Sequence, residues 1–281
     1  MKYIAGVSGG PDSMALLDKY KKKITLVCHV NYNKRDTAIR DRKIVSDYCK
    51  KNKINLKILN VTDKIYKVYK KKSNNFQNIA RLIRYDFFLK NAKKINCYNL
   101  LISHNLNDFV ETGIMQIKRN SKALFYGIKK NSNYKDLNII RPLLFKPKIN
   151  LKKYCETHNV SYGIDESNFS DLYERNRIRK TIDKTSLKYF YKKILKHNKK
   201  NAKLNTKITK LYSAWKQKNY LDTFLNSQND ECKYHMAYRL LSENDIPNIS
   251  STKIDSLLKF AEKSKKNKSF RLTNDLFICK K

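Results

Sequence analysis

The sequence has few of the residues that usually interrupt helices and strands: 6 glycines and 4 prolines among 281 residues. No stretch rich in either residue marks a linker, and no internal repeat is present. The 6 cysteines lie far apart without a C-x-x-C pair, which argues against a zinc site or an iron–sulfur cluster. No apolar run approaches the roughly 20 residues of a membrane span, and the first residues lack a signal-peptide core. We therefore expect a soluble, cytoplasmic protein.

Acidic residues are also scarce: 24 Asp and Glu stand against 62 Lys and Arg, a formal net charge of +38. Hydrophobic residues make up 41% of the sequence, too many for a disordered chain, so this charge lies on the surface of a folded protein. A cation of this size attracts polyanions, and nucleic acid is the usual partner. A codon bias that raises lysine and asparagine everywhere is the alternative explanation for the charge.

Short apolar runs alternate with helical patterns through the first 160 residues. Ile79, Ile83 and Phe87, for example, fall on one face of an expected helix. Continuous apolar strands separated by helices are typical of a parallel sheet covered on both faces. Ligands of such sheets bind beyond the carboxyl ends of the strands, where the topology switches. The sequence thus predicts an α/β fold, with strands at 3–8, 24–32, 55–61, 98–104 and 137–144.

The pattern changes near residue 181, after which the sequence favours basic, amphipathic helices at 185–218, 231–243 and 252–264. The last segment, 270–280, alternates apolar and polar residues like a terminal hairpin. We therefore predict two domains: an α/β domain at 1–180, and a smaller, mostly helical, basic domain at 181–281.

Half of the glycines lie in the first ten residues, two of them in the segment SGGPDS (8–13) that follows the first strand. Glycine lets backbone N–H groups curl around an anion, and a helix beginning at Ser13 points its positive end to the same place. The turn has neither the lysine of a P-loop nor the G-x-G-x-x-G of dinucleotide-binding folds. Two compatible interpretations account for Asp12: a helix N-cap, or a group that meets phosphate through Mg²⁺.

The segment SGGPDSMALL (8–17) resembles the PP-loop of the N-type ATP pyrophosphatases, which split ATP into AMP and pyrophosphate. Further segments resemble, in the same order, the signatures of the tRNA(Ile)-lysidine synthetase family, and the last residues resemble the end of its small C-terminal domain. They are HVNYNKRDTAIRD (29–41), NFQNIARLIRYDFF (75–88), ISHNLNDFVETGIMQIKR (102–119), RPLL (141–144) and DESNFSDLYERNRIR (165–179).

The resemblance implies a PP-loop catalytic domain at 1–180 and a tRNA-binding domain at 181–281. The family joins L-lysine to the wobble cytidine of an isoleucine tRNA with a CAU anticodon. ATP adenylates the C2 oxygen of that cytosine, and the lysine ε-amine then displaces AMP, so ATP, Mg²⁺, lysine and this tRNA are the expected partners. Asp12 is then a catalytic residue and a Mg²⁺ contact. The residues implied to bind ATP are Ser8, Gly9, Gly10, Pro11, Asp12 and Ser13.

His104, Asp108 and Glu111 are spaced four and three apart at the start of an expected helix, which aligns their side chains on one face. Taken singly, each is a surface or capping residue by default, and a zinc site is a weak alternative. By resemblance, all three line the cavity that takes lysine, in which carboxylates can hold the ammonium group. The resemblance therefore makes Asp108 and Glu111 catalytic candidates. Arg84 matches a family arginine suited to a carboxylate in that cavity.

Arg175, Arg177 and Arg179 crowd into five positions, together with Asn176. Such a cluster is either a solvated face or, by resemblance, a contact to nucleotide or tRNA phosphate. The resemblance also makes Arg119 a candidate RNA contact. The chain departs from the family pattern at three positions, for which no catalytic role follows: Tyr32 for His, Asn107 for Asp and Asn120 for Gly.

Two other functions stay open at this stage. A tRNA thiolase would use the same ATP chemistry, but such enzymes generally need a cysteine pair that is absent here. A non-catalytic RNA-binding remnant of the fold would have no reason to keep SGGPDS intact together with the His104, Asp108 and Glu111 group.

Overall fold

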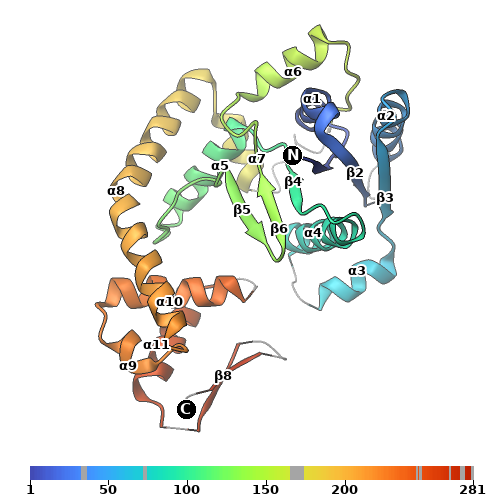
Figure 1. Cartoon of the computed structure of the whole chain (residues 1–281). Coiled ribbons are helices and arrows are strands. Elements are labelled where there is room, and N and C mark those ends of the chain that lie inside the picture. The colour runs from blue at the N-terminus through green and yellow to red at the C-terminus, as the bar shows by residue number, and fades with distance from the viewer. Residues whose placement is uncertain are drawn as a thin grey trace. The chain divides into compact units, whose positions relative to one another are not determined.

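The computed structural model describes residues 1–32, 37–71, 75–164, 174–244, 246, 249–265, 267–272 and 276–279. Parts of three segments that carry the family resemblance lie outside the described residues: 33–36, 165–173, and 273–275 with 280–281. The chain forms two compact units, Met1–Asn198 and Lys199–Lys281 (Figure 1). Helix α8 (Lys184–Gln217) runs through this division without a break. The domain boundary expected at residue 180 stays a prediction.

The centre of the first unit is a sheet of six strands: β1 (Tyr3–Gly6), β2 (Ile24–Asn31), β3 (Asn55–Asn60), β4 (Asn99–Leu101), β5 (Asn131–Tyr134) and β6 (Leu137–Ile140) (Figure 1). Their order is β3-β2-β1-β4-β6-β5, and all neighbours are parallel except β5 with β6. The predicted α/β fold is confirmed, with shorter strands than expected. The edge strand β5 is not predicted, because its sequence NSNY has no apolar run.

Three helices cover one face of the sheet: α1 (Pro11–Tyr20), α2 (Thr37–Lys51) and α6 (Lys148–Thr157). A short 3₁₀ turn, η1 (Lys21–Lys23), joins α1 to β2. Burying these apolar side chains removes them from water, which is the main force that holds the layers together. The side chains buried between α1, α2, α6 and the sheet include Ala5, Val7, Met14, Leu16, Leu17, Val45, Cys49, Leu101, Leu151 and Cys155.

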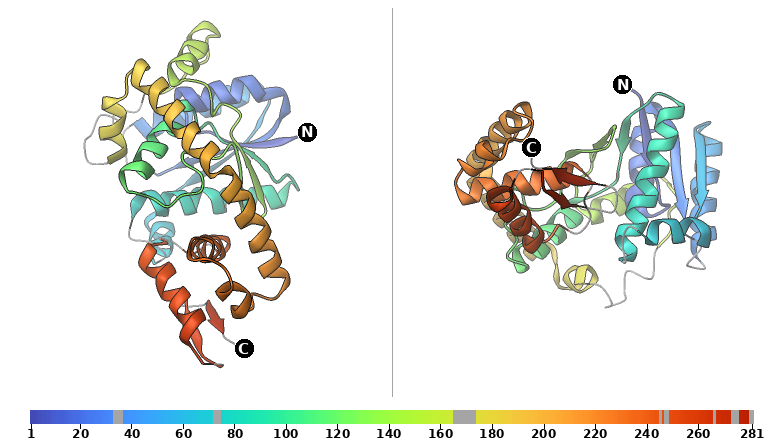
Figure 2. Two further views of the ribbon diagram at one scale, coloured as in Figure 1. Left: turned by 90° about the vertical axis from the view of Figure 1, so that its left-hand side faces the viewer. Right: turned by 90° about the horizontal axis from the view of Figure 1, so that it is seen from below.

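Helix α4 (Phe76–Lys94) covers the opposite face, with α3 (Asp63–Lys70) packed beside it (Figure 2). Asn75 begins α4 as its N-cap, since its side chain accepts the N–H of Gln77. Ile79 and Ile83 are buried, as their spacing predicts. Further along α4, the buried side chains that pack on the sheet are Tyr85, Phe88, Leu89 and Ala92.

Helices α5 (Leu106–Lys118) and α7 (Glu174–Thr181) pack against each other and against the beginning of α8. Ile178 of α7 is buried in this group, which fixes the face that α7 turns toward α5. The buried side chains of the group are Phe109, Val110, Ile114, Leu144, Ile178, Leu187 and Ile194.

The second unit is mostly helical, which confirms the expectation for the C-terminal part. The helices predicted at 185–218, 231–243 and 252–264 are present with ends shifted by about one residue, and the terminal hairpin pairs antiparallel. No helix in the described part of the chain is long and apolar enough to cross a membrane. After α8 the elements are α9 (Asp222–Asn226), α10 (Asp230–Glu243), α11 (Ser251–Lys263), β7 (Ser269–Arg271) and β8 (Phe277–Cys279).

The strand order positions the functional site. From β1 the chain builds β2 and β3 outward on one side, then crosses to add β4 on the other side of β1. The carboxyl ends of β1 and β4 therefore flank the point where the topology switches, and ligands of open α/β sheets bind at this point. SGGPDS follows β1 and His104 follows β4, so both lie at the switch point.

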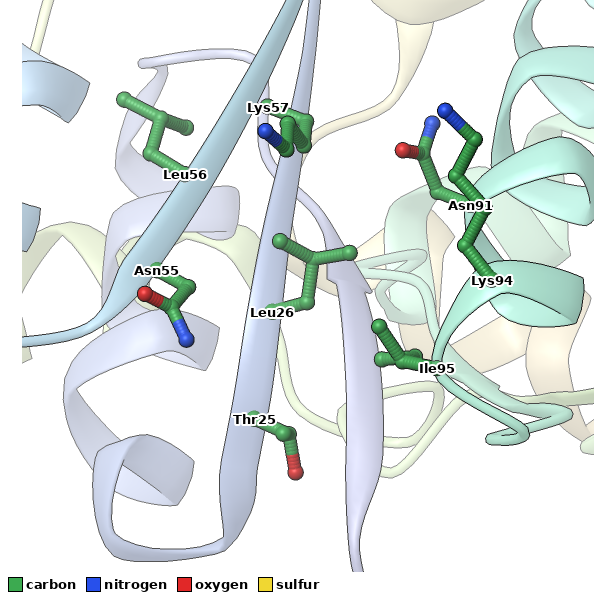
Figure 3. A pocket seen from close by; sticks show the side chains of 8 residues that line it. All are labelled: Thr25, Leu26, Asn55, Leu56, Lys57, Asn91, Lys94 and Ile95. Carbon is green, nitrogen blue, oxygen red and sulfur yellow. The ribbon is translucent and has the colours of Figure 1, made fainter.

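A cavity of about 300 Å³ lies at the other end of the sheet (Figure 3). Thr25 and Asn55 at the starts of β2 and β3 line it, together with Asn91, Lys94 and neighbouring side chains around the end of α4. The amino ends of parallel strands are not where such sheets bind ligands, and we assign no function to this cavity.

Asp18 of α1 holds the helical layer together through polar contacts. Its carboxylate accepts hydrogen bonds from the hydroxyls of Tyr48 in α2 (2.6 Å) and Tyr154 in α6 (2.6 Å), and from Lys21 Nζ (2.8 Å). Burial alone would raise the pKa of Asp18, but the hydrogen bonds from Lys21, Tyr154 and Tyr48 outweigh it and lower the pKa to about 2.

We expect Asp18→Asn to lower the free energy of unfolding at pH 7 by about 1–3 kcal/mol, because hydrogen bonds to a charged group are lost. A lowered pKa stabilises the fold above the ordinary carboxyl range, and this contribution disappears as the pH falls from about 4 toward 2. Urea denaturation should show a constant difference between wild type and variant from pH 7 to 5, and a smaller one at pH 3.5. Asp47→Asn, which removes an exposed carboxylate of α2 paired with Lys43, is the matched control and should change stability little. A constant difference down to pH 3.5 would contradict this account of Asp18.

Candidate functional site at the carboxyl ends of β1 and β4

The turn after β1 is held in shape by a serine inside the following helix. Ser13 Oγ accepts the N–H groups of Ser8 (3.2 Å) and Gly9 (3.1 Å) and donates to the carbonyl oxygen of Gly10 (2.9 Å). Helix α1 begins at Pro11, two residues earlier than expected, with Gly10 as an N-cap that makes no side-chain capping bond. The first turn of α1 therefore points its positive end at this site without a protein side chain covering it, a suitable arrangement for phosphate.

Gly9 is required by both its backbone and its surroundings. Its φ of +94° lies in a region that side-chain-bearing residues rarely adopt, and a Cβ there would lie 2.9 Å from the Cβ of Asp41. The carbonyl oxygen of Gly9 accepts the N–H of Gly163 (2.9 Å). The turn is thus packed between the start of α2 and the chain that follows α6, which fixes its shape before a ligand binds.

The structure corrects one interpretation of Asp12. Asp12 is the second residue of α1 and not its N-cap, so capping does not explain the carboxylate. Its Oδ1 is buried and has no hydrogen-bond partner in the described part of the chain. Burial and, to a smaller extent, the charge of Asp108 raise the pKa of Asp12, while Lys148, the Asn105 side chain and Arg179 oppose the rise, so that the pKa is about 6. A buried carboxylate oxygen with no partner is a costly feature that a bound group would relieve.

The surroundings of Asp12 fit Mg²⁺. This ion prefers oxygen ligands and is usually held by one or two carboxylates plus substrate phosphates. Here one unpartnered carboxylate oxygen lies beside the turn and the helix end that suit phosphate. Asp12 is the residue that would hold the ion, which would supply positive charge between the carboxylate and the phosphates.

His104 lies in the loop after β4, and Asn105 begins α5 as its N-cap. The imidazole Nδ1 accepts a hydrogen bond from Arg141 Nε (2.9 Å). Burial lowers the pKa of His104 to about 3, and the charges of Arg141, Arg175 and Arg84 lower it as well. His104 is therefore neutral at physiological pH. It lies outside the helix, so the expectation that it shares one helical face with Asp108 and Glu111 is wrong.

Asp108 takes part in the start of α5. Its Oδ2 accepts the N–H of Asn105 (2.9 Å), while Asn105 Oδ1 accepts the N–H of Asp108 (3.1 Å), which together make a capping box. The remaining oxygen, Oδ1, accepts from Arg175 NH2 (2.8 Å). One carboxylate thus serves the helix start and the site at the same time.

Glu111 is 1% exposed and is held by two arginines of α7. Arg175 Nε donates to Oε2 (2.7 Å), and Arg179 donates to Oε1 (2.8 Å) and to Oε2 (3.2 Å). Asp108 and Glu111 carry two negative charges, and the guanidinium groups of Arg175 and Arg179 carry two positive charges. The structure thus brings four of the predicted site residues together in a balanced cluster.

The other candidate arginines lie apart from this cluster. Arg177 is exposed on α7, between the two arginines that face α5. Arg119 follows the end of α5 and forms an exposed ion pair with Glu174. Arg84 is exposed on α4 and acts on His104 through its charge.

The three departures from the family pattern have structural roles here. Tyr32 donates its hydroxyl to the carbonyl oxygen of Ala80 (2.7 Å), and Asn107 Oδ1 accepts the N–H of Lys148 at the start of α6 (3.0 Å). Asn120 has a φ of +46°, a left-handed conformation that explains why glycine suits this position.

Sequence reasoning assigned no role to three residues that contact or charge the site. Arg141 binds His104, Asn105 hydrogen-bonds Asp12, and Lys148 lowers the pKa of Asp12. Arg141 belongs to RPLL (141–144), and the resemblance of this segment to the family is the signal that could have indicated its role. Nothing in the sequence distinguishes Asn105 or Lys148 from the many other Asn and Lys residues.

These features define a PP-loop protein, and comparison with known proteins agrees. A family model described as a PP-loop domain matches residues 1–186. Among solved structures, the U34-tRNA thiolase NcsA from Methanococcus maripaludis, which carries a [4Fe–4S] cluster, is similar with a TM-score of 0.57 and 21% identity. The similarity covers 72% of this chain and 73% of that one, and at this identity it shows the fold alone.

Comparison with curated relatives shows which family of PP-loop proteins the chain belongs to. The chain is 45% identical to the tRNA(Ile)-lysidine synthase of Ureaplasma parvum over 99% of this chain and 84% of the relative. It is 38% identical to that of Malacoplasma penetrans and 39% identical to that of Mycoplasma genitalium, over 95% of each relative and nearly all of this chain. The chain belongs to the tRNA(Ile)-lysidine synthase family.

The two glycines of the turn offer a matched test of its geometry. We expect Gly9→Ala to lower the free energy of unfolding by about 1–3 kcal/mol, because of its positive φ and the contact with Asp41. Gly10 has an extended backbone, and a Cβ there would meet its nearest atom at 3.8 Å, so Gly10→Ala should change stability by less than about 1 kcal/mol. Urea denaturation of both variants measures this, and equal losses would show that the turn is not strained at Gly9.

Proposed function

We propose that this protein ligates L-lysine to the C2 carbon of the wobble cytidine in the CAU anticodon of an isoleucine tRNA. The reaction consumes ATP and gives lysidine, AMP and pyrophosphate. ATP first transfers its adenylyl group to the C2 oxygen of the cytosine, with release of pyrophosphate. The lysine ε-amine then attacks C2, and AMP leaves with that oxygen. The observation that carries the proposal is the Asp12 oxygen Oδ1, which is buried without a hydrogen-bond partner among the described residues, beside the phosphate-binding turn in a chain of this family.

The turn and α1 support the role of ATP. Ser8, Gly9 and Gly10 curl before an uncapped helix end, which attracts the phosphates. Asp12 and phosphate both carry negative charge, so Asp12 would hold Mg²⁺ between them, and the ion would supply positive charge to the phosphates. A cation bound at Asp12 would favour the ionised carboxylate, whose pKa burial raises to about 6.

The carboxylates of α5 supply the negative charge for the lysine ammonium group. In the structure described here, Arg175 and Arg179 already balance them. An ammonium group therefore has to displace one guanidinium. Arg175 is the one that leaves, since its side chain is 38% exposed against 28% for Arg179, and Arg179 bonds both oxygens of Glu111. Arg84 faces the lysine carboxylate with an opposite charge.

The basic C-terminal unit supports binding of tRNA. Lys203, Lys207 and Lys210 are exposed on α8 with the spacing of one helical face. Phosphate contacts from such side chains dominate affinity for nucleic acid and are weakened by salt. The target cytosine leaves the anticodon stack to reach ATP, as in other enzymes that modify a base.

The decisive experiment incubates the protein with CAU-anticodon tRNA, ATP, Mg²⁺ and labelled lysine, followed by nucleoside analysis. Lysidine formation with one AMP released per lysine incorporated supports the proposal. Incorporation of sulfur from a sulfur donor would instead identify a thiolase. Binding of tRNA without AMP release would identify an RNA-binding protein without this activity.

Asp12→Asn should reduce AMP release by a factor of about 100 or more, because it removes the charge that holds the ion at the phosphates. The affinity for tRNA should stay unchanged, since it rests on other residues. Asp86→Asn is the matched control, because Asp86 also carries a carboxylate in unit 1 but binds Tyr69, Tyr134 and Lys135. AMP release by Asp12→Asn at the wild-type rate would refute the assignment of Asp12.

Replacement of Lys203, Lys207 and Lys210 by glutamine should weaken tRNA binding and reduce the slope of log affinity against log salt by about 2. Lys50, Lys51 and Lys53, which are exposed around the end of α2, provide a control with the same change in charge. Filter binding across a salt series measures both triple variants. Equal slopes for the two would show that α8 does not contact phosphate.

A further inference from the structure

Arg141 is buried directly after β6, with 3% of its surface exposed. Its NH1 donates to the carbonyl oxygen of Lys129 (2.9 Å) and to Ser132 Oγ (2.9 Å), and its side chain hydrogen-bonds Tyr85. These contacts fix the guanidinium between β5, β6 and α4. Its Nε then donates to His104 Nδ1 at 2.9 Å. The imidazole is thus held by a side chain that is itself fully immobilised.

This contact determines where the imidazole carries its proton. A guanidinium has donors only and stays charged at all physiological pH values, so Nδ1 must accept with its lone pair. A neutral imidazole carries one N–H, which must then lie on Nε2. His29 shows the opposite arrangement, because its Nδ1 lies 2.9 Å from the carbonyl oxygen of Val7 and must donate to it.

The Nε2–H group of His104 has no hydrogen-bond partner among the described residues. The charges around the ring are positive: Arg141, Arg175, Arg84 and Arg81 all lower the pKa of His104. A donor surrounded by guanidinium groups suits a substrate oxygen with negative charge. It does not suit an ammonium group, and it cannot take a proton from one.

We propose that Arg141 is a positioning residue that fixes His104 as the Nε2–H tautomer, so that His104 donates a hydrogen bond to the carboxylate of the amino-acid substrate. This inference rests on the proposed function for the identity of the substrate, but the tautomer itself does not. His104 then acts beside Arg84 in binding lysine, and the proton of the lysine ammonium group goes to another acceptor.

The tautomer is read directly from two-bond proton–nitrogen NMR spectra of the full-length protein labelled with ¹⁵N-histidine. His104→Gln identifies the signals of His104, and His29 serves as an internal reference of the opposite tautomer. We expect His104 to show a protonated Nε2 and an unprotonated Nδ1 at neutral pH. An imidazolium, or a proton on Nδ1, would overturn the inference.

Two variants of His104 separate its contacts. Glutamine places an amide N–H₂ near the position of Nε2 and so keeps the donor, whereas asparagine places its oxygen near Nδ1 and keeps only the contact with Arg141. We expect the KM for lysine to stay within about threefold in His104→Gln and to rise about tenfold or more in His104→Asn, with the KM for ATP unchanged in both. Equal KM values for lysine in the two variants would show that Nε2 does not bind this substrate.

Arg141→Met and Arg141→Lys test the positioning role. Methionine removes the donor, so His104 should show a mixture of tautomers and a raised KM for lysine. Lysine keeps a charged donor and should restore the Nε2–H tautomer at least in part. An unchanged tautomer in Arg141→Met would overturn the role of Arg141. If Arg141→Met does not fold, the wild-type spectrum and the His104 pair still decide the tautomer and the donor, and a proton on Nδ1 in Arg141→Lys would still overturn the role of Arg141.

The activity of the protein and the tautomer of His104 are measured separately. Absence of lysine incorporation by the wild-type protein would overturn the proposed function, whereas the NMR tautomer would still be measured. Normal lysine incorporation together with a proton on Nδ1 would overturn the inference and leave the proposed function intact.

Discussion

The arrangement of the site depends on one buried carboxylate. Glu111 lies in the middle of α5 with 1% of its surface exposed, where an uncompensated negative charge would be very costly. Arg175 and Arg179 provide the compensation, and they are one helical turn apart on the face of α7 that also buries Ile178. The ion pairs therefore tie α7 to α5, although the two helices are separated by more than 50 residues. Because Arg175 also contacts Asp108, the same contacts set the geometry of the helix start beside His104.

Burial shifts two neighbouring groups of the site in opposite directions. It raises the pKa of Asp12 to about 6 and lowers the pKa of His104 to about 3, since it disfavours the charged form of each. The charges near Asp12 and near His104 have different effects. Lys148 and Arg179 favour the ionised form of Asp12, while the arginines around His104 keep it neutral. The result is a negative group on the side of the PP-loop and a neutral donor on the side of α4, which suits a site that binds a metal–phosphate group and a carboxylate in separate places.

The sequence predicts the fold and the class of the site well, because both depend on local signals. Apolar runs mark the parallel strands, and SGGPDS marks the turn at the switch point. The sequence does not predict features that depend on contacts between residues far apart in the chain. The edge strand β5 forms because NSNY pairs with β6, without an apolar run of its own. The N-cap of α1 is Gly10 because Ser13 folds back on the turn, which leaves Asp12 inside the helix. Arg175 and Arg179 look like part of a solvated cluster until α7 packs on α5.

The departures from the family pattern lie at residues that support the backbone of this site and not at its ionisable groups. Asn107 and Asn120 serve the backbone, one through the start of α6 and the other through a left-handed turn after α5. Both roles need only a side chain or a backbone conformation that asparagine supplies, and neither needs a charge. Asp12, His104 and Glu111 are different, because each is a buried or half-buried ionisable group whose environment would be unfavourable for another residue. Glu111 is matched by two guanidinium groups and His104 Nδ1 by a fixed donor, whereas Asp12 Oδ1 has no hydrogen-bond partner within the described residues. Glu111 is therefore paired within the protein alone, whereas His104 Nε2–H and Asp12 Oδ1 are left for a ligand.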